Sequence, residues 1–144
     1  MNSIRTTDLQ DTKVDVKVVL SGLWVSMLFV FAYVDIFGFW RADVIESALA
    51  REAPGLGLGI DQAFLTLTTV YVLVPILMVA VSLVAPARAN RVANIVVSLL
   101  YTASVVATVI GETWVYYVLG SAVEVVLLLV IARIAWTWRR RSGG

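Results

Sequence analysis

The sequence predicts an all-α integral membrane protein in which a single domain, residues 1–144, forms a bundle of four transmembrane helices. The first observation is composition: 60% of the residues are hydrophobic and 15% are charged, whereas soluble domains average about 45–50% and about 25%. The second is that the apolar residues gather in four runs, each close to the roughly 20 residues that a helix needs to cross the hydrocarbon core. Helices buried in a soluble bundle would carry charged outer faces, and these runs have none.

The four predicted spans differ in the charged residues that they contain. The first contains Asp35, the fourth contains Glu124 and Arg133, and the second and third contain none. Each span is long enough for one helical crossing, so the chain should cross the membrane four times. The spans cover residues 18–40, 63–85, 92–110 and 114–136.

The connections predict which helices are neighbours. Residues 86–91 read as a short turn, which makes the second and third spans antiparallel neighbours, and residues 111–113 make the third and fourth a tight hairpin. The connection over residues 41–62 is long. Its first half predicts a short amphipathic helix on the outer membrane surface, because four apolar residues recur there at helical spacing: Val44, Ile45, Ala48 and Leu49. The glycine-rich second half should be irregular.

The distribution of Lys and Arg predicts the orientation, because short cytoplasmic loops carry an excess of basic residues. In a four-span arrangement, Arg41 and Arg51 lie on one side and the other nine basic residues lie on the opposite side. We therefore expect both termini in the cytoplasm and the chain in the inner (plasma) membrane. Tryptophans at span ends, where amphipathic rings settle at the headgroups, agree with the span limits: Trp40, Trp114, Trp136 and Trp138. The nine basic residues are Arg5, Lys13, Lys17, Arg88, Arg91, Arg133, Arg139, Arg140 and Arg141.

The composition also narrows the chemistry. The chain has no Cys and no His, which excludes disulfides, Cys/His zinc sites, iron–sulfur clusters and His-ligated haem. Neither a phosphate-binding loop nor a catalytic motif is present. A net charge of +1 provides no field for nucleic acid. We therefore predict no catalytic residues, no metal and no cofactor.

Polar residues lie on one face of each predicted span and should meet in the interior of the bundle. Among them, Glu124 lies about ten residues into the fourth span, about 15 Å along the helix and near the bilayer midplane. A lone carboxylate is costly at that depth, so we expect it to be protonated, paired or hydrated. The polar faces are formed by Ser21 and Asp35; by Thr68, Tyr71 and Ser82; by Asn94, Ser98, Tyr101, Thr102 and Thr108; and by Tyr117, Ser121 and Glu124.

Two readings of Glu124 remain open. In the first it is a proton- or ligand-binding group, and the side chains predicted to surround it form one site: Tyr71, Asn94, Tyr101, Tyr117 and Ser121. In the second it is a structural group that holds the bundle together through hydrogen bonds to Tyr71, Tyr101 or Asn94. Intramembrane carboxylates favour function as a working hypothesis.

Two further features could shape such a site. Asp35, Arg41 and Glu112 are predicted to line an outer mouth, although Asp35 could instead be an ordinary hydrogen-bonding residue at the interface. Pro75 interrupts the second span and leaves the carbonyl of Tyr71 without its usual amide donor. Such a break can bend a helix around a site.

Six stretches spread over almost the whole chain are distinctive: LQDTKVDVKVVLSGLW (9–24), YVDIFGFW (33–40), PILMVAVSL (75–83), NRVANIV (90–96), WVYYVLGSAVE (114–124) and AWTW (135–138). They resemble a family of small bacterial integral membrane proteins that is catalogued only as a numbered domain of unknown function and is distantly similar to DoxX-like four-helix proteins. The resemblance implies a four-helix membrane bundle and no particular activity.

Three classes of function follow. The leading one is a small ligand-binding or transport module, embedded in membrane lipid, that accepts a small or amphipathic ligand near Glu124 and self-associates. The second is a non-catalytic accessory or scaffolding subunit of a larger membrane complex. An enzyme acting on lipid or quinone comes third, since no acid–base pair is recognisable.

Overall fold

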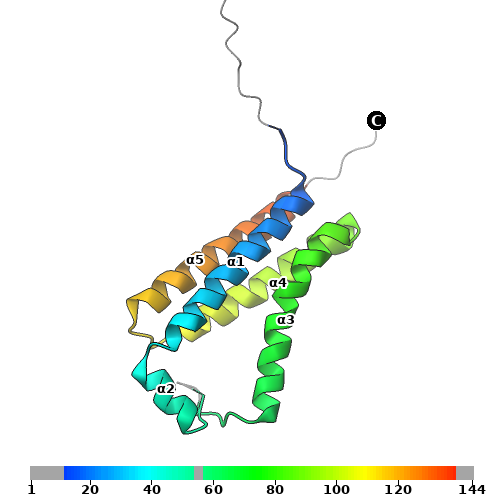
Figure 1. Cartoon of the computed structure of the whole chain (residues 1–144). Coiled ribbons are helices and arrows are strands. Elements are labelled where there is room, and N and C mark those ends of the chain that lie inside the picture. The colour runs from blue at the N-terminus through cyan, green and yellow to red at the C-terminus, as the bar shows by residue number, and fades with distance from the viewer. Residues whose placement is uncertain (1–11, 54–56, 139–144) are drawn as a thin grey trace, which may run out of the picture.

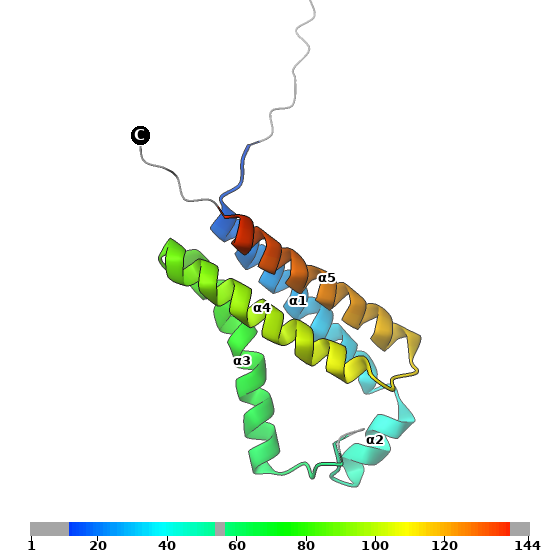
Figure 2. The ribbon, with the colours of Figure 1, turned by 180° about the vertical axis from the view of Figure 1, so that it is seen from behind.

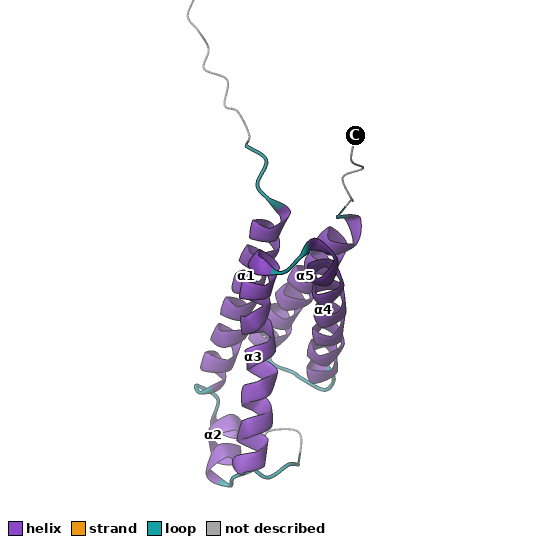
Figure 3. Ribbon diagram, turned by 90° about the vertical axis from the view of Figure 1, so that its right-hand side faces the viewer, coloured by secondary structure: helices purple, strands orange, loops and turns teal. Residues whose placement is uncertain are grey.

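A computed structural model of the chain describes residues 12–53 and 57–138, and this part is built from helices (Figures 1 and 3). Four of the helices have 23 residues each and are apolar enough to cross a membrane. At about 1.5 Å per residue, each is long enough for a hydrocarbon core of about 30 Å. The all-α, four-span prediction is confirmed, and the chain is a multi-pass membrane protein. The helices are α1 (Val16–Gly38), α2 (Ala42–Leu49), α3 (Gln62–Val84), α4 (Ala87–Val109) and α5 (Val115–Thr137).

The four long helices form a ring in which each packs on two neighbours. Both α1 and α4 contact α3 and α5, so α3 and α5 lie diagonally across the bundle. Successive long helices run in opposite directions (Figures 1 and 2). We call the end where α1 begins and α5 ends the terminal end, and the opposite end, next to the short helix, the α2 end.

Two predicted limits need correction. Helix α4 begins at Ala87, whereas the prediction placed its start at residue 92 and assigned residues 86–91 to a turn. Arg88 and Arg91 lowered the apolar signal there without preventing a helix, and Pro86 is well placed at the helix start because its backbone needs no donor. Helix α1 ends at Gly38 rather than at residue 40, which leaves Trp40 in the connection, 85% exposed. Arg5, residues 139–141 and residues 54–56 lie outside the described residues.

Buried positions recur at alternating spacings of three and four residues along the helices. In α5 they are Ser121, Glu124, Leu128, Ile131 and Ala135. This seven-residue repeat is the pattern of helices that pack at small crossing angles with side chains fitted between those of their neighbours. The periodicity therefore fixes which face of each helix points inward.

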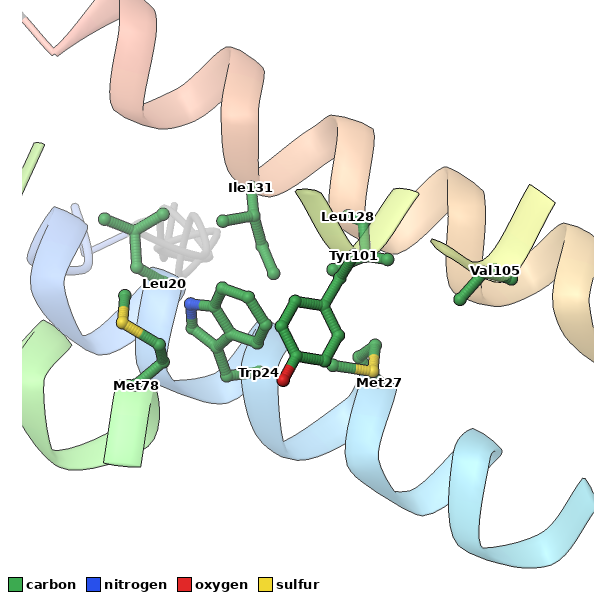
Figure 4. Packing of buried hydrophobic residues seen from close by; sticks show 8 residues of the cluster. All are labelled: Leu20, Trp24, Met27, Met78, Tyr101, Val105, Leu128 and Ile131. Atoms are coloured by element: carbon green, nitrogen blue, oxygen red, sulfur yellow. The ribbon is translucent and has the colours of Figure 1, made fainter. Parts of the chain in front are cut away.

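The apolar core centres on Trp24, whose side chain is fully buried, and extends along α4 toward the α2 end as far as Val105 (Figure 4). All four long helices contribute side chains to it. The cluster consists of Leu20, Trp24, Met27, Met78, Tyr101, Val105, Leu128 and Ile131.

Gly120 allows α1 and α5 to approach closely. A Cβ atom built on Gly120 would lie 2.2 Å from Cγ2 of Val34, which is itself buried. Small residues at such crossings are typical of membrane helix pairs, because van der Waals contact replaces the hydrophobic effect there.

Basic side chains at the terminal end cap two helices. The ammonium of Lys17 donates to the carbonyl oxygens of Leu83 and Ala85, at 3.3 and 2.8 Å, where α3 ends. Arg91 donates to the carbonyl of Trp136 at 2.9 Å, where α5 ends. These carbonyls have no partner within their own helices, and a positive charge also suits the negative end of the helix dipole. Two of the basic residues used to predict orientation thus also stabilise the fold.

Helix α3 bends near Pro75, and its first half turns away from the other long helices (Figures 1 and 2). The exposure of the side chains changes at the same point. Pro75, Met78 and Ser82 in the second half are buried, whereas every residue from Gln62 to Tyr71 except Phe64 is exposed. The bundle is therefore closed at the terminal end and open beside α3 at the α2 end.

The predicted short helix is present as α2, and its apolar residues Ile45 and Leu49 are exposed. After it, the chain turns back on itself: the amide of Ala53 donates to Leu58 at 2.7 Å, and that of Ile60 donates to Arg51 at 2.7 Å. These bonds link the end of α2 to the approach to α3.

Candidate functional site

Asn94 is at the centre of a closed polar network in the terminal half. Its side-chain oxygen accepts from the indole N–H of Trp24 at 2.7 Å and from the hydroxyl of Ser82 at 3.2 Å. Its amide donates to the backbone and side-chain oxygens of Asn90, at 2.9 and 2.6 Å. The Asn90 amide in turn donates to the carbonyl of Ser82 at 2.6 Å. Every member is fully or almost fully buried and hydrogen bonded, so this network joins α1, α3 and α4 and leaves no group free for a ligand.

An aromatic layer lies next in the direction of the α2 end. The rings of Tyr71 and Tyr101 stack with their centroids 4.7 Å apart, and the ring of Phe31 packs on that of Tyr71 with a centroid distance of 6.4 Å. The hydroxyl of Tyr101 donates to the carbonyl of Tyr71, which is the carbonyl that Pro75 deprives of its amide donor. The bend in α3 is thus stabilised by a side chain of α4. The hydroxyl of Tyr71 pairs with that of Ser104 at 2.7 Å.

Glu124 extends from α5 into the interior and is only 3% exposed. Among the described residues, none donates a hydrogen bond to its carboxyl group and none forms an ion pair with it. All side-chain oxygens and nitrogens that are fully shielded within this part of the chain do have partners. The unpartnered oxygens of Glu124 must therefore border accessible space and not packed protein.

Three further ionisable side chains lie within electrostatic reach of Glu124. The charges of Glu124 and Asp35 interact with each other and with the hydroxyl groups of Tyr71 and Tyr117. They come from three helices: Asp35 from α1, Tyr71 from α3 and the other two from α5. Asp35 is itself exposed. Two carboxyl groups and two phenols therefore lie close together, with no cation of the described chain paired to them.

A separate ionic network lies at the α2 end. The guanidinium of Arg41 contacts Asp43 at 2.6 Å and Glu112 at 3.1 Å, and it lies 4.8 Å from the ring centroid of Trp114. The other oxygen of Glu112 accepts from the amides of Thr113 and Trp114, at 2.8 and 3.0 Å, just before α5 begins. These contacts connect the end of α1 with the α4–α5 turn.

The Arg41 network changes the pKa of its acids. Burial raises the pKa of Glu112, but hydrogen bonds from Trp114, Arg41 and Thr113 outweigh it, so the pKa is lowered from its ordinary value. The hydrogen bond from Arg41 likewise lowers the pKa of Asp43. Both groups are therefore charged at neutral pH and hold Arg41 in place.

The predicted site residues separate into three groups. Tyr71 and Tyr117 lie within electrostatic reach of Glu124, and Tyr101 stacks on Tyr71. Ser121 lies one turn from Glu124 and is buried. Asn94 lies about seven residues, or roughly 10 Å, from Tyr101 along α4 and belongs to the closed network. Of the predicted outer mouth, Arg41 and Glu112 meet, whereas Asp35 joins Glu124.

The expected hydrogen bonds from Tyr71, Tyr101 or Asn94 to Glu124 are absent. Tyr71 is hydrogen bonded to Ser104, Tyr101 donates to a backbone carbonyl, and the amide of Asn94 donates to Asn90. The polar face predicted for α4 also ends earlier than expected, because Thr108 is exposed. In α3, Thr68 is exposed as well.

Sequence reasoning missed Asn90, Ser104 and the role of Trp24. Asn90 was placed in a turn because two arginines flank it. The signal that could have found it is the spacing of Asn90, Asn94 and Ser98, four residues apart on one face. Ser104 carries no comparable pattern.

A comparison with protein-family models matches residues 9–143 to one family, described as a family of unknown function (DUF6326). The chain belongs to this family. The match includes all five helices, so the predicted membership of an uncharacterised family with four spans is confirmed. No curated protein and no solved structure matches the chain. The likeness to DoxX-like proteins and the bacterial origin stay predictions.

Proposed function

We propose that this chain is a ligand-binding or transport module whose site is the space around Glu124. The observation that carries the proposal is the carboxyl group of Glu124, buried near the middle of α5 with neither a hydrogen-bond donor nor a cation among the described residues. An isolated carboxyl group at membrane depth is costly, and such groups mark substrate and ion pathways. The nearby Asn94 network shows the contrast, because its polar groups are all paired.

The arrangement of the helices supports access to this space from one side. The bend at Pro75 moves the first half of α3 outward, and Glu124 lies on the helix diagonally opposite to it. Apolar side chains such as Leu65, Leu67 and Val70 are exposed along that half of α3. A ligand with an apolar body and a polar group fits surroundings of this kind.

The experiment uses the full chain in lipid nanodiscs and a panel of cationic, neutral and anionic amphiphiles. A ligand that binds the folded protein raises its thermal stability, by about 2.7 kcal/mol at a hundred times Kd. We expect at least one class to stabilise the wild type and to lose that effect with Glu124→Gln. Glu46→Gln is the matched control, because it removes the same charge from the surface of α2. Equal stabilisation of Glu124→Gln and the wild type by every amphiphile would refute the proposal.

Transport is then separated from binding by flux. Each amphiphile that binds is loaded into vesicles that contain the protein, and its release is compared between wild type and Glu124→Gln. Release that depends on Glu124 supports transport, whereas binding without release limits the function to binding.

The second candidate is an accessory subunit of a membrane complex, and the exposed apolar face of α3 favours it. The chain has no cysteine, so Leu67→Cys provides a single cross-linking position on that face. A cross-link to a different protein in cells supports the accessory role, and a cross-link to a second copy supports self-association. Neither product would be expected if lipid alone covers α3.

For orientation, we propose that the terminal end faces the cytoplasm at the plasma membrane. The support is the excess of basic residues at that end of the described chain: Lys13, Lys17, Arg88, Arg91 and Arg133, against Arg41 and Arg51 at the α2 end. An impermeant maleimide applied to intact cells should label Glu46→Cys and should label Arg88→Cys only after permeabilisation. The reverse pattern would contradict this orientation.

A further inference from the structure

The charges around Glu124 indicate the class of ligand, provided that the proposed function holds. The carboxyl groups of Asp35 and Glu124 lie close enough to interact, and no Lys or Arg of the described chain pairs with either. Arg41, the nearest candidate in sequence to Asp35, is held by Asp43 and Glu112. The space is therefore acidic without an internal counter-ion.

Aromatic rings provide the second part of the recognition. Phe31 and Tyr71 lie in contact, Tyr71 stacks on Tyr101, and Tyr117 interacts with both carboxyl groups. Ring faces attract cations, with about 2 kcal/mol or more where water is excluded. Carboxyl groups together with phenyl and phenol rings are the features that recognise quaternary ammonium and related organic cations.

The depth of the site limits the ligand further. Glu124 is the tenth residue of α5, so it lies roughly 14 Å from the start of the helix. A small hydrated metal ion would need several oxygen ligands there, and the described residues contain no group of three acidic side chains that could hold one. The headgroup of an intact bilayer lipid would not reach this depth without leaving the interface. A cation with apolar substituents can occupy it.

We propose that the space bounded by Asp35, Tyr71, Tyr117 and Glu124 binds amphipathic organic cations. The positive centre lies between the two carboxyl groups, and the apolar substituents contact the aromatic layer and the first half of α3. Exchange with the membrane takes place on the open side of the bundle, beside α3.

Two probes of nearly equal size and opposite charge test this directly: tetraphenylphosphonium and tetraphenylborate. Their binding to the full chain in nanodiscs is measured by equilibrium dialysis, with empty nanodiscs subtracted. We expect saturable phosphonium binding that is at least about tenfold tighter than borate binding. Glu124→Gln should weaken phosphonium binding by about tenfold or more, and Glu46→Gln should leave it unchanged.

Asp35→Asn is a second variant, at an exposed residue, and it should also weaken phosphonium binding. Circular dichroism and gel filtration verify that each variant is folded. Equal binding of the two probes, or phosphonium binding that neither substitution weakens, would overturn the inference.

The inference and the proposed function can fail separately. If a neutral or anionic amphiphile stabilises the protein through Glu124 and tetraphenylphosphonium does not bind, the proposed ligand site at Glu124 is supported and the inference that its ligand is a cation is refuted. If no amphiphile of any class responds to Glu124→Gln, both are wrong.

Discussion

The hydrogen bond from Tyr101 to the carbonyl of Tyr71 gives the sharpest stability prediction. Pro75 cannot donate to that carbonyl, and the Tyr101 hydroxyl takes the place of the missing amide. Tyr101→Phe removes the hydroxyl and keeps the ring that stacks on Tyr71. Because the carbonyl would then be unpaired inside the membrane, we expect a loss of about 0.6–1.7 kcal/mol, the range of interhelical hydrogen bonds in membranes.

A double-mutant cycle isolates this bond. Pro75→Ala restores an amide that can donate to the carbonyl of Tyr71, so Tyr101→Phe should cost clearly less in that background. The coupling free energy between the two substitutions should therefore be about 0.5–1.5 kcal/mol. Unfolding by sodium dodecyl sulfate in mixed micelles, followed by circular dichroism, measures each corner of the cycle. Tyr33→Phe, at an exposed tyrosine of α1, is the control and should change little. An equal cost of Tyr101→Phe in both backgrounds would refute the reasoning.

Three further substitutions test other contacts. Gly120→Ala should destabilise the bundle by about 1–3 kcal/mol in the same unfolding assay, because its Cβ would collide with Val34; no change would mean that the helices separate freely. Asn94→Leu should cost about 1–3 kcal/mol, since a buried indole N–H and a buried hydroxyl lose their acceptor; a neutral result would contradict the closed network. Glu112 has a lowered pKa, so its contribution is full above the ordinary Glu range of about 4.3 and is lost as pH falls through the lower folded-state pKa. Arg41→Gln should reduce that loss at acid pH, and an unchanged pH profile of stability would count against the ion pair.

The helices were predictable because each long span is apolar over its full length, which length and composition alone reveal. The start of α4 was not predictable in this way, because Arg88 and Arg91 lower the hydropathy of its first turns although the helix continues out of the hydrocarbon core. Helical spacing also identified the inward face correctly for Ser121 and Glu124 in α5.

Which residues form the site depends on contacts between helices, and residue spacing within one helix does not predict these contacts. Asn94 and Tyr101 share the inward face of α4, so the sequence assigned both to Glu124, yet their axial separation places Asn94 in another network. Pro75 predicted that the carbonyl of Tyr71 lacks its amide donor. It did not predict that the hydroxyl of Tyr101 donates instead, because Tyr101 is 30 residues away from Tyr71 in sequence. Asp35 was expected near Arg41, but Asp43, two residues from Arg41, provides a closer partner.

The central claim is that the space beside Glu124 is accessible while the Asn94 network is closed. The absence of cysteine allows Ser104→Cys and Ser98→Cys to be compared directly, since both serines lie on α4 and only Ser98 is fully buried. The measurement is the rate at which a cationic methanethiosulfonate reagent modifies each thiol in the membrane. The account predicts fast modification at position 104, slowed by tetraphenylphosphonium, and almost none at position 98. Equal rates at the two positions, or no modification at 104, would contradict it.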